Sequence, residues 1–307
     1  MNYTASDELT IRAKQLGEVG EDWLQDLPAK VERLQNRFNL RLGESLGGGT
    51  ESLVIAAQSD WGDCVLKLGL PDNLKREARA YELANGQGYA YAHAYIDEED
   101  ALITEALGGM LVDAGLPVAE QIEHLVCALE SSWQVDVGPE GLMSGSEKAQ
   151  WHLDYVKPQL EQNSSDLSQD HLERATTFAN ERQASHQDAT STLSHGDGHA
   201  WNALAASGDL AYKFVDPDGH YAERAYDLSI LMREWVEEML IGDPAENGIA
   251  RCQALGERTG EPMRAIWQWG FVEQVSTYLM LLELNWPEVA KQHLAVVEGW
   301  SRVTDFD

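Results

Sequence analysis

The sequence predicts a bilobal α+β protein, in which a small β-rich lobe is followed by a large helical lobe. Short apolar runs separated by glycine and acidic turns fill residues 38–107, which is typical of a small sheet. After Gly108 and Gly109 the apolar residues recur at helical spacing instead. With 307 residues and 43% hydrophobic composition, the chain is long enough for two packed lobes.

The small lobe is expected to contain a sheet and one helix. Residues 7–37 precede it and are expected to be helical, with Pro28 near the start of a second helix. From Leu40 a glycine cluster joins the first two strands as a hairpin, and Lys67 lies within the third. The other expected elements are the helix Leu74–Ala84 and the strands Tyr89–Ile96 and Ala101–Glu105. We therefore divide the chain into a helical extension (1–37), an N-lobe (38–107) and a C-lobe (108–307).

The large lobe is expected to be helical apart from one strand, Ala211–Val215. Apolar periodicity and capping residues predict its helices. They cover Val118–Trp133, Glu147–Gln162, Gln169–Gln187, Tyr226–Leu240, Glu246–Thr259, Pro262–Leu282 and Pro287–Trp300.

The chain is strongly acidic, with 22 Lys and Arg against 52 Asp and Glu and a formal net charge of -30. Such a charge repels nucleic acid and anionic membranes and attracts cations. Adaptation to salt and attraction of a cationic small-molecule substrate both explain it. The excess is spread along the whole chain, which favours salt adaptation or solubility.

The cysteine pattern and the chain ends indicate a cytoplasmic protein. Cys64, Cys127 and Cys252 are an odd number without a CxxC pair, which indicates neither a disulfide framework nor a zinc site. The N-terminal stretch lacks the cationic end and apolar core of a signal peptide. No apolar stretch approaches the length of a membrane span.

The stretch LSHGDGHAWNAL, residues 193–204, concentrates polar side chains between apolar flanks. His195 and His199 have the spacing of two metal ligands on a helix, but Gly196 stands where metallohydrolases carry a glutamate. A polar turn without chemistry is a second interpretation. In a third, Asp197 accepts the proton of a substrate hydroxyl and Asn202, five residues later, holds magnesium.

Further residues occur in the order of a kinase-type site. Lys67 lies in an apolar strand, where its charge requires a partner; Glu77 on the next helix suits this role best, with Glu82 as the rival. Asp216 follows the strand at 211–215, as a second metal-binding aspartate would. A turn that can approach phosphates closely stands between the first two strands, with Gly47, Gly48, Gly49, Thr50 and Ser52.

Each of these features alone has an ordinary explanation, such as a hairpin glycine, a snorkelling lysine or an Asp-Pro turn. Their joint occurrence in one order favours a phosphotransferase that uses ATP and Mg²⁺.

With these residues the chain resembles the aminoglycoside phosphotransferase family, which has a protein-kinase-like fold, and within it the streptomycin 6-kinase and hydroxyurea phosphotransferase branch. The family loop reads His-Gly-Asp-x-His-x-x-Asn, and HGDGHAWN matches it at each fixed position. Val-Asp-Pro at 215–217 and AYDL at 225–228 match the metal-binding turn and the segment after it. REARAYELANGQG and LITEAL add to a likeness that spans roughly residues 35–300.

The resemblance implies a role for each matched residue. Asp197 would be the catalytic base, and Asn202 and Asp216 would bind magnesium. Lys67 would hold the nucleotide phosphates with Glu77 as its partner. The remaining roles are adenine binding by the backbone of Glu105–Leu107 and bracing of the loop by His195, His199 and Asp227.

Two residues depart from the family loop. Gly198 replaces a large apolar residue, and Trp201 is bulky for its position. Trp201 could line the substrate cleft or fill space, and we favour the second interpretation. The acceptor site is less defined. Glu234, Glu237, Glu238 and Asp243 could face a cationic acceptor or form a solvated helix face, and Trp235, Trp267 and Trp269 at helical spacing are more typical of a core.

Three functions follow from the sequence. The first is O-phosphorylation of an aminoglycoside-type antibiotic. The second is a kinase of an ordinary hydroxylated metabolite, such as a sugar or amino alcohol. The third is a nucleotide-binding pseudokinase, against which the filled catalytic positions argue. Substrate data are needed to separate the first two, because fold alone does not determine the acceptor.

Overall fold

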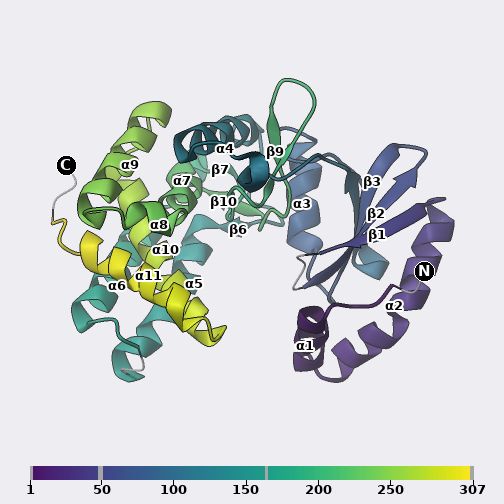
Figure 1. The fold of residues 1–307 in the computed structure, drawn as a ribbon, viewed down its shortest axis with the longest axis horizontal. Coiled ribbons are helices and arrows are strands. Elements are labelled where there is room, and N and C mark those ends of the chain that lie inside the picture. The colour runs from purple at the N-terminus through teal and green to yellow at the C-terminus, as the bar shows by residue number, and fades with distance from the viewer. Residues whose placement is uncertain (1–2, 48–50, 163–164, 305–307) are drawn as a thin grey trace.

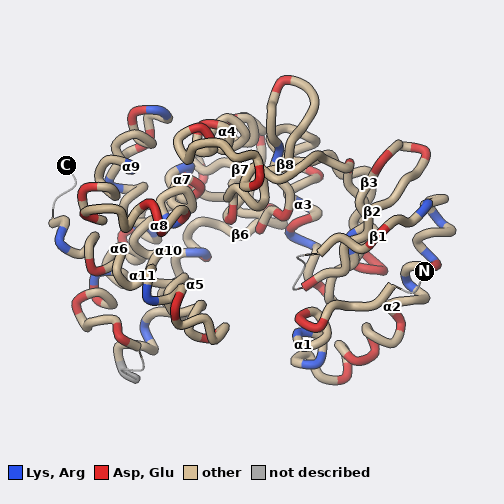
Figure 2. Tube along the Cα trace, viewed as in Figure 1, with Lys and Arg blue, Asp and Glu red and all other residues tan. Residues whose placement is uncertain are grey.

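The computed structural model describes residues 3–47, 51–162 and 165–304 and confirms the bilobal α+β class. Figure 1 shows a sheet-containing N-terminal lobe beside a larger helical lobe. Within the described residues, no helix is both long enough and apolar enough to cross a membrane. Acidic residues are spread over both lobes, as Figure 2 shows.

The N-terminal lobe is built on an antiparallel five-stranded sheet of order β1-β2-β3-β5-β4. All five strands lie where the sequence predicts a strand, although β4 is shorter. The segment before β4 pairs with the helical lobe instead, because the amide of Ala90 donates to the carbonyl of Phe214. The strands are β1 (Arg41–Leu46), β2 (Ser52–Ser59), β3 (Gly62–Gly69), β4 (Ala92–Ile96) and β5 (Ala101–Glu105).

Two N-terminal helices, α1 (Asp7–Gln15) and α2 (Glu18–Arg37), share one hydrophobic core with this sheet. The prediction that Pro28 lies near the start of a helix is wrong, because α2 begins ten residues earlier, after Gly17, and runs through the proline. The buried residues of α2 recur at helical spacing on both sides of Pro28. Their burial outweighs the one backbone hydrogen bond that proline forgoes. These residues are Trp23, Leu27, Val31 and Leu34.

The helical lobe packs around α10 (Met263–Glu283), which is buried on nearly all sides. The predicted helix at 226–240 is wrong in one respect, because it is broken at Glu234 and Trp235. Trp235 has a φ of +54°, and the side chain of Arg251 donates to the carbonyl of Glu234 at 2.7 Å. The other helices are α3 (Lys75–Ala84) between the lobes, α4 (Val118–Ser132), α5 (Gly145–Gln162), α6 (Gln169–Ser185), α7 (Arg224–Arg233), α8 (Val236–Met239), α9 (Pro244–Thr259) and α11 (Pro287–Trp300).

Two small sheets hold the loop between residues 194 and 203. β7 (Thr192–Ser194), which precedes the loop in the sequence, pairs with β10 (His220–Ala222), which follows it. β6 (Met143–Ser144) pairs with the other edge of β10. β8 (Ala203–Ala205) pairs with β9 (Tyr212–Phe214), the centre of the predicted strand 211–215. The loop therefore begins and ends on strands, which fixes its polar side chains in space.

Candidate active site

Two buried side chains, His195 and Asp227, anchor the loop from His195 to Asn202. The Nε2 atom of His195 lies 3.0 Å from the carbonyl oxygen of Val215, and the amide of Asp197 donates to its Nδ1 at 3.2 Å. Nε2 is therefore the protonated nitrogen of a neutral ring, and burial lowers the pKa of His195 to about 4. Both ring nitrogens are engaged, which excludes the interpretation of His195 and His199 as paired metal ligands.

Asp227 is the second anchor. It is 1% exposed, and its two carboxylate oxygens accept from the amide of Gly196 at 3.0 Å and from the indole of Trp133 at 2.8 Å. Gly196 has a φ of +88°, and a Cβ atom there would lie 2.2 Å from Nδ1 of His220. The loop thus requires glycine at this position.

The carboxylate of Asp197 has a basic side chain on each oxygen. The guanidinium of Arg233 lies 2.6 Å from Oδ1, and Nε2 of His199 lies 3.2 Å from Oδ2. Burial would raise the pKa of Asp197, but the charge of Arg233 and the bond to His199 outweigh it and hold that pKa well below its usual range. The side chain of Asn202 donates to the carbonyl of Asp197 at 3.0 Å, which leaves its oxygen available as a ligand.

Lys67 joins the two lobes. Its ammonium lies 2.8 Å and 2.7 Å from the two carboxylate oxygens of Glu77 and also contacts the carboxylate of Asp216. The rival Glu82 points outward, with a 70% exposed side chain, and pairs with Arg79. Burial opposes the charge of Lys67, but the two carboxylates raise its pKa above the ordinary value. The structure thus brings together the lysine, the helix glutamate and the strand-end aspartate of the prediction.

Asp216 and Asp218 present carboxylates at the end of β9. Asp216 has a φ of +61°, and its amide donates to the hydroxyl of Tyr81 at 2.9 Å. Asp218 was not singled out by the sequence analysis. Although the side chain of Asp218 is exposed to the cavity, desolvation by the surrounding protein and the charges of Asp197 and Asp216 raise its pKa to about 6. Such mutual repulsion is what a bound divalent cation would relieve.

The donors fit magnesium in their chemistry. Asn202, Asp216 and Asp218 offer amide and carboxylate oxygens, the hard ligands that Mg²⁺ takes in proteins. Among the described residues, no group of three His, Cys, Asp or Glu side chains is gathered closely enough to hold an ion by itself. This agrees with the general behaviour of Mg²⁺, which is usually bound by one or two carboxylates together with substrate phosphates.

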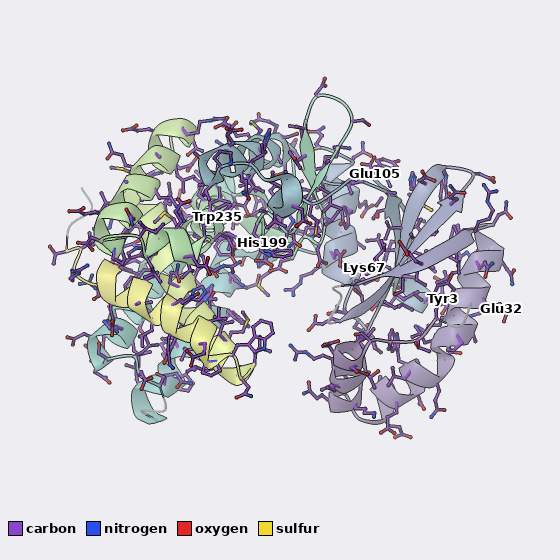
Figure 3. All side chains as sticks on the ribbon, viewed as in Figure 1. Tyr3, Glu32, Lys67, Glu105, His199 and Trp235 are labelled. Carbon is purple, nitrogen blue, oxygen red and sulfur yellow. The ribbon has the colours of Figure 1, made fainter. Side chains whose placement is uncertain are left out.

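The predicted nucleotide-binding residues lie along the N-lobe sheet, and Figure 3 shows Lys67 and Glu105 on this side of the molecule. Ser52 is buried at the start of β2, and Gly47 follows β1. Gly48, Gly49 and Thr50 lie outside the described residues. Glu105 accepts from the amide of Tyr91 at 2.7 Å and from Lys213 at 2.8 Å. Within the described part of the chain, the amide of Leu107 has no hydrogen-bond acceptor.

A cavity of about 990 Å³ opens beside Asp197 in the helical lobe. Its walls come from the loop at 196–201, from the turn at 233–238 and from α5, α10 and α11. Trp201 lines this cavity and is 57% exposed, so the interpretation of Trp201 as a space-filling residue is wrong. Gly198 is explained by packing, because a Cβ atom there would already lie 3.3 Å from the ring of Phe214.

The residues proposed for the acceptor divide into three groups. Glu234, Glu237 and Glu238 line the cavity together with Trp235. Trp267 and Trp269 lie in the core, as helical spacing predicts. Asp243 instead caps α9, accepting from the amide of Ala245 at 3.0 Å.

Comparison with known proteins identifies the fold. No protein-family model and no curated protein matches this sequence. Among solved structures, the chain is similar to aminoglycoside phosphotransferase APH(4)-Ia, with a TM-score of 0.60 and 15% identity over 90% of this chain and 99% of that one. It is also similar to macrolide 2'-phosphotransferase MphH from Brachybacterium faecium (TM-score 0.56, 18% identity, coverage 92% and 100%).

A third similar structure is spectinomycin phosphotransferase APH(9)-Ia in complex with ADP and spectinomycin (TM-score 0.53, 14% identity, coverage 89% and 93%). A further structure of APH(4)-Ia contains ADP and hygromycin B. At these identities the likeness establishes the kinase-like fold of antibiotic phosphotransferases, and the function has to be argued from the site.

Proposed function

We propose that this chain is an ATP-dependent O-phosphotransferase that moves the γ-phosphoryl group of ATP to a hydroxyl of an aminoglycoside-type antibiotic. The observation that carries the proposal is the position of Asp197. Its carboxylate lines the cavity of the helical lobe. The same loop ends at Asn202, and Asp216, which follows β9, contacts Lys67 of the N-lobe. An acceptor hydroxyl and a nucleotide phosphate could therefore meet at one carboxylate.

The mechanism assigns each residue a physical task. Asp197 orients the acceptor hydroxyl and takes its proton while the hydroxyl oxygen attacks the γ-phosphorus and the bond to ADP breaks. Lys67, held by Glu77, offsets the charge of the phosphates. Asn202, Asp216 and Asp218 would hold Mg²⁺, which supplies charge neutralisation at the phosphates. The free amide of Leu107 and the backbone of Glu105 would bond adenine.

The similar structures support nucleotide and antibiotic binding as the starting hypothesis, since they contain ADP with hygromycin B or with spectinomycin. A pseudokinase is disfavoured because Asp197, Asn202 and Asp216 are all present in the sequence. Phosphorylation of a small metabolite remains the second candidate, although about 990 Å³ lies at the upper end of the usual ligand-site range. The cytoplasm, where ATP and magnesium are available, is the proposed location.

The product identifies the reaction directly. The purified protein is incubated with MgATP and an antibiotic acceptor, and the product is analysed by mass spectrometry and phosphorus NMR. We expect one phosphate ester on one hydroxyl, absent with Asp197→Ala. An ester formed equally well by Asp197→Ala would reject the proposed role of Asp197.

A further inference from the structure

Apolar side chains exposed on four different elements converge on the cavity beside Asp197. Trp201 of the loop is 57% exposed, Trp151 of α5 is 45%, Met280 of α10 is 43% and Val289 of α11 is 44%. Large apolar side chains gathered on one concave surface mark a site that buries them against a ligand. The cavity can therefore bind a ligand through an apolar face as well as through a hydroxyl group.

Trp201 is the most open of these side chains. Within the described residues its ring has no aromatic or cationic neighbour. Trp151, in contrast, stacks on Tyr155 at 5.3 Å and has the ammonium of Lys148 4.4 Å from its ring centroid. An indole buries a large area when a ring packs on it, so Trp201 offers an unused contact surface four residues from Asp197.

The carboxylates of the cavity are largely occupied by the protein's own cations. Arg233 pairs with Asp197 at 2.6 Å, with Glu234 at 3.1 Å and with Glu273 at 3.4 Å. Glu238 pairs with Arg251 at 3.1 Å. A ligand ammonium would have to displace an arginine from each of these carboxylates. Most of the acidic residues predicted to hold a polycation are therefore not available to it.

Three charged residues of the wall are not paired in this way. Among the described residues, Glu237 and Asp218 have no cation and Lys148 has no carboxylate within 4.0 Å, and Asp218 is one of the carboxylates proposed above to hold Mg²⁺. Glu237 could hold one ligand ammonium. Lys148 would repel a second one on the α5 side of the same cavity.

From this distribution, and resting on the phosphotransferase function proposed above, we infer that the acceptor is a large amphipathic molecule. It carries a broad apolar face that packs on Trp201, Met280 and Val289, a hydroxyl that reaches Asp197, and a single ammonium group that faces Glu237. The inference keeps the phosphoryl transfer to a hydroxyl proposed above and replaces its hydrophilic, polycationic aminoglycoside acceptor by this amphipathic class.

The test compares two probes by equilibrium binding and by turnover. The first probe is a macrolide with one dimethylamino sugar, which has the inferred chemistry, and the second is hygromycin B, a hydrophilic polyamine. Binding is measured without nucleotide by calorimetry, so that it does not depend on transfer. We expect the macrolide to bind at least about tenfold more tightly, and to give the larger kcat/KM in MgATP.

Variants locate the binding surface. Trp201→Ala is expected to weaken macrolide binding by roughly 10- to 100-fold, the loss from one large apolar side chain that becomes buried. Glu237→Gln should weaken it by only about two- to fivefold, since an exposed ion pair contributes little. Trp286→Ala is the matched control, because Trp286 is 58% exposed but lies outside the cavity walls.

The outcomes separate this inference from the proposed function. Tighter binding of hygromycin B, or a Trp201→Ala variant that binds the macrolide like the Trp286→Ala control, overturns the inferred acceptor. If such a protein still phosphorylates hygromycin B, the proposed function stands. Preferred macrolide binding that depends on Trp201, without any transfer in MgATP, supports the inferred ligand class and rejects the phosphotransferase.

Discussion

The guanidinium of Arg233 and the carboxylate of Asp197 form a 2.6 Å ion pair in the wall of the acceptor cavity. Arg233 is itself held, because its other nitrogen lies 3.4 Å from Glu273, and Gln274 donates to its carbonyl at 3.1 Å. The pair therefore connects the predicted base to the buried helix α10. Arg233 acts on Asp197 by fixing its orientation.

Arg233→Met is expected to lower kcat by about 100-fold while the KM for ATP changes little, because a misoriented base loses alignment and the nucleotide site is untouched. Arg233→Lys should recover part of the loss. Steady-state kinetics and thermal unfolding check both variants. Arg233→Met also leaves the buried charge of Glu273 without this partner, which could destabilise the fold. The double variant Arg233→Met with Glu273→Gln removes that charge and is therefore the control. Full recovery of kcat in the double variant would show that Arg233 only stabilises the fold.

The pair of Lys67 and Glu77 gives a second prediction. Glu77→Gln should lower kcat/KM for ATP by about 100-fold or more, because Lys67 loses the carboxylate that holds it near the phosphates. Glu82→Gln on the same helix is the matched control, since the side chain of Glu82 is 70% exposed and pairs with Arg79. Equal activity of the two variants would mean that Glu77 does not position Lys67.

Buried histidines predict a loss of stability in mild acid. His293 is 8% exposed, its Nδ1 lies 2.7 Å from the side-chain oxygen of Gln274, and burial lowers its pKa to about 4. The folded pKa lies below the unfolded value of about 6.5, so this contribution is complete above pH 6.5 and is lost as the pH falls toward 4. His293→Asn keeps a donor for Gln274 but does not titrate.

Urea unfolding measures this effect. Between pH 7.5 and 5, the wild-type protein should lose about 2 kcal/mol more unfolding free energy than His293→Asn. Parallel stability curves for the two proteins would show that His293 does not take up a proton on unfolding.

Gly196 predicts a backbone effect. Gly196→Ala should destabilise the fold by at least about 2 kcal/mol and lower Tm by about 4 °C or more, because the φ of +88° and the side chain of His220 both oppose a Cβ atom. Differential scanning calorimetry checks this value. Gly109→Ala is the control, since a Cβ atom there meets nothing within 4 Å. An unchanged Tm for Gly196→Ala would contradict the geometry of the loop.

Much of the fold and part of the site could be predicted from the sequence, because their signals are local. The strands around Lys67 and the helix with Glu77 have clear periodicity, and the spacing of Asp197 and Asn202 lies within one loop. The structure brings these residues together as expected, while their chemical roles remain predictions.

What the sequence did not indicate depends on contacts between distant segments. Arg233 is 36 residues from Asp197 and lies at a helix end that Arg251 and Gln274 bend. Strands of two or three residues, such as β6, β7 and β10, are too short to show a period. The exposure of Trp201 and the close approach of Gly198 to Phe214 are both tertiary features, which no pattern in the loop reveals.

The central claim is that Asp197 serves phosphoryl transfer to a small-molecule hydroxyl. The most direct measurement is magnesium-dependent ADP release from ATP across a panel of aminoglycosides including streptomycin, a macrolide and simple hydroxylated metabolites, with Asp197→Ala as the blank. We predict that at least one antibiotic accelerates ADP release in the wild-type protein and not in the blank. ATP binding without acceleration by any compound would contradict the claim and favour a nucleotide-binding pseudokinase.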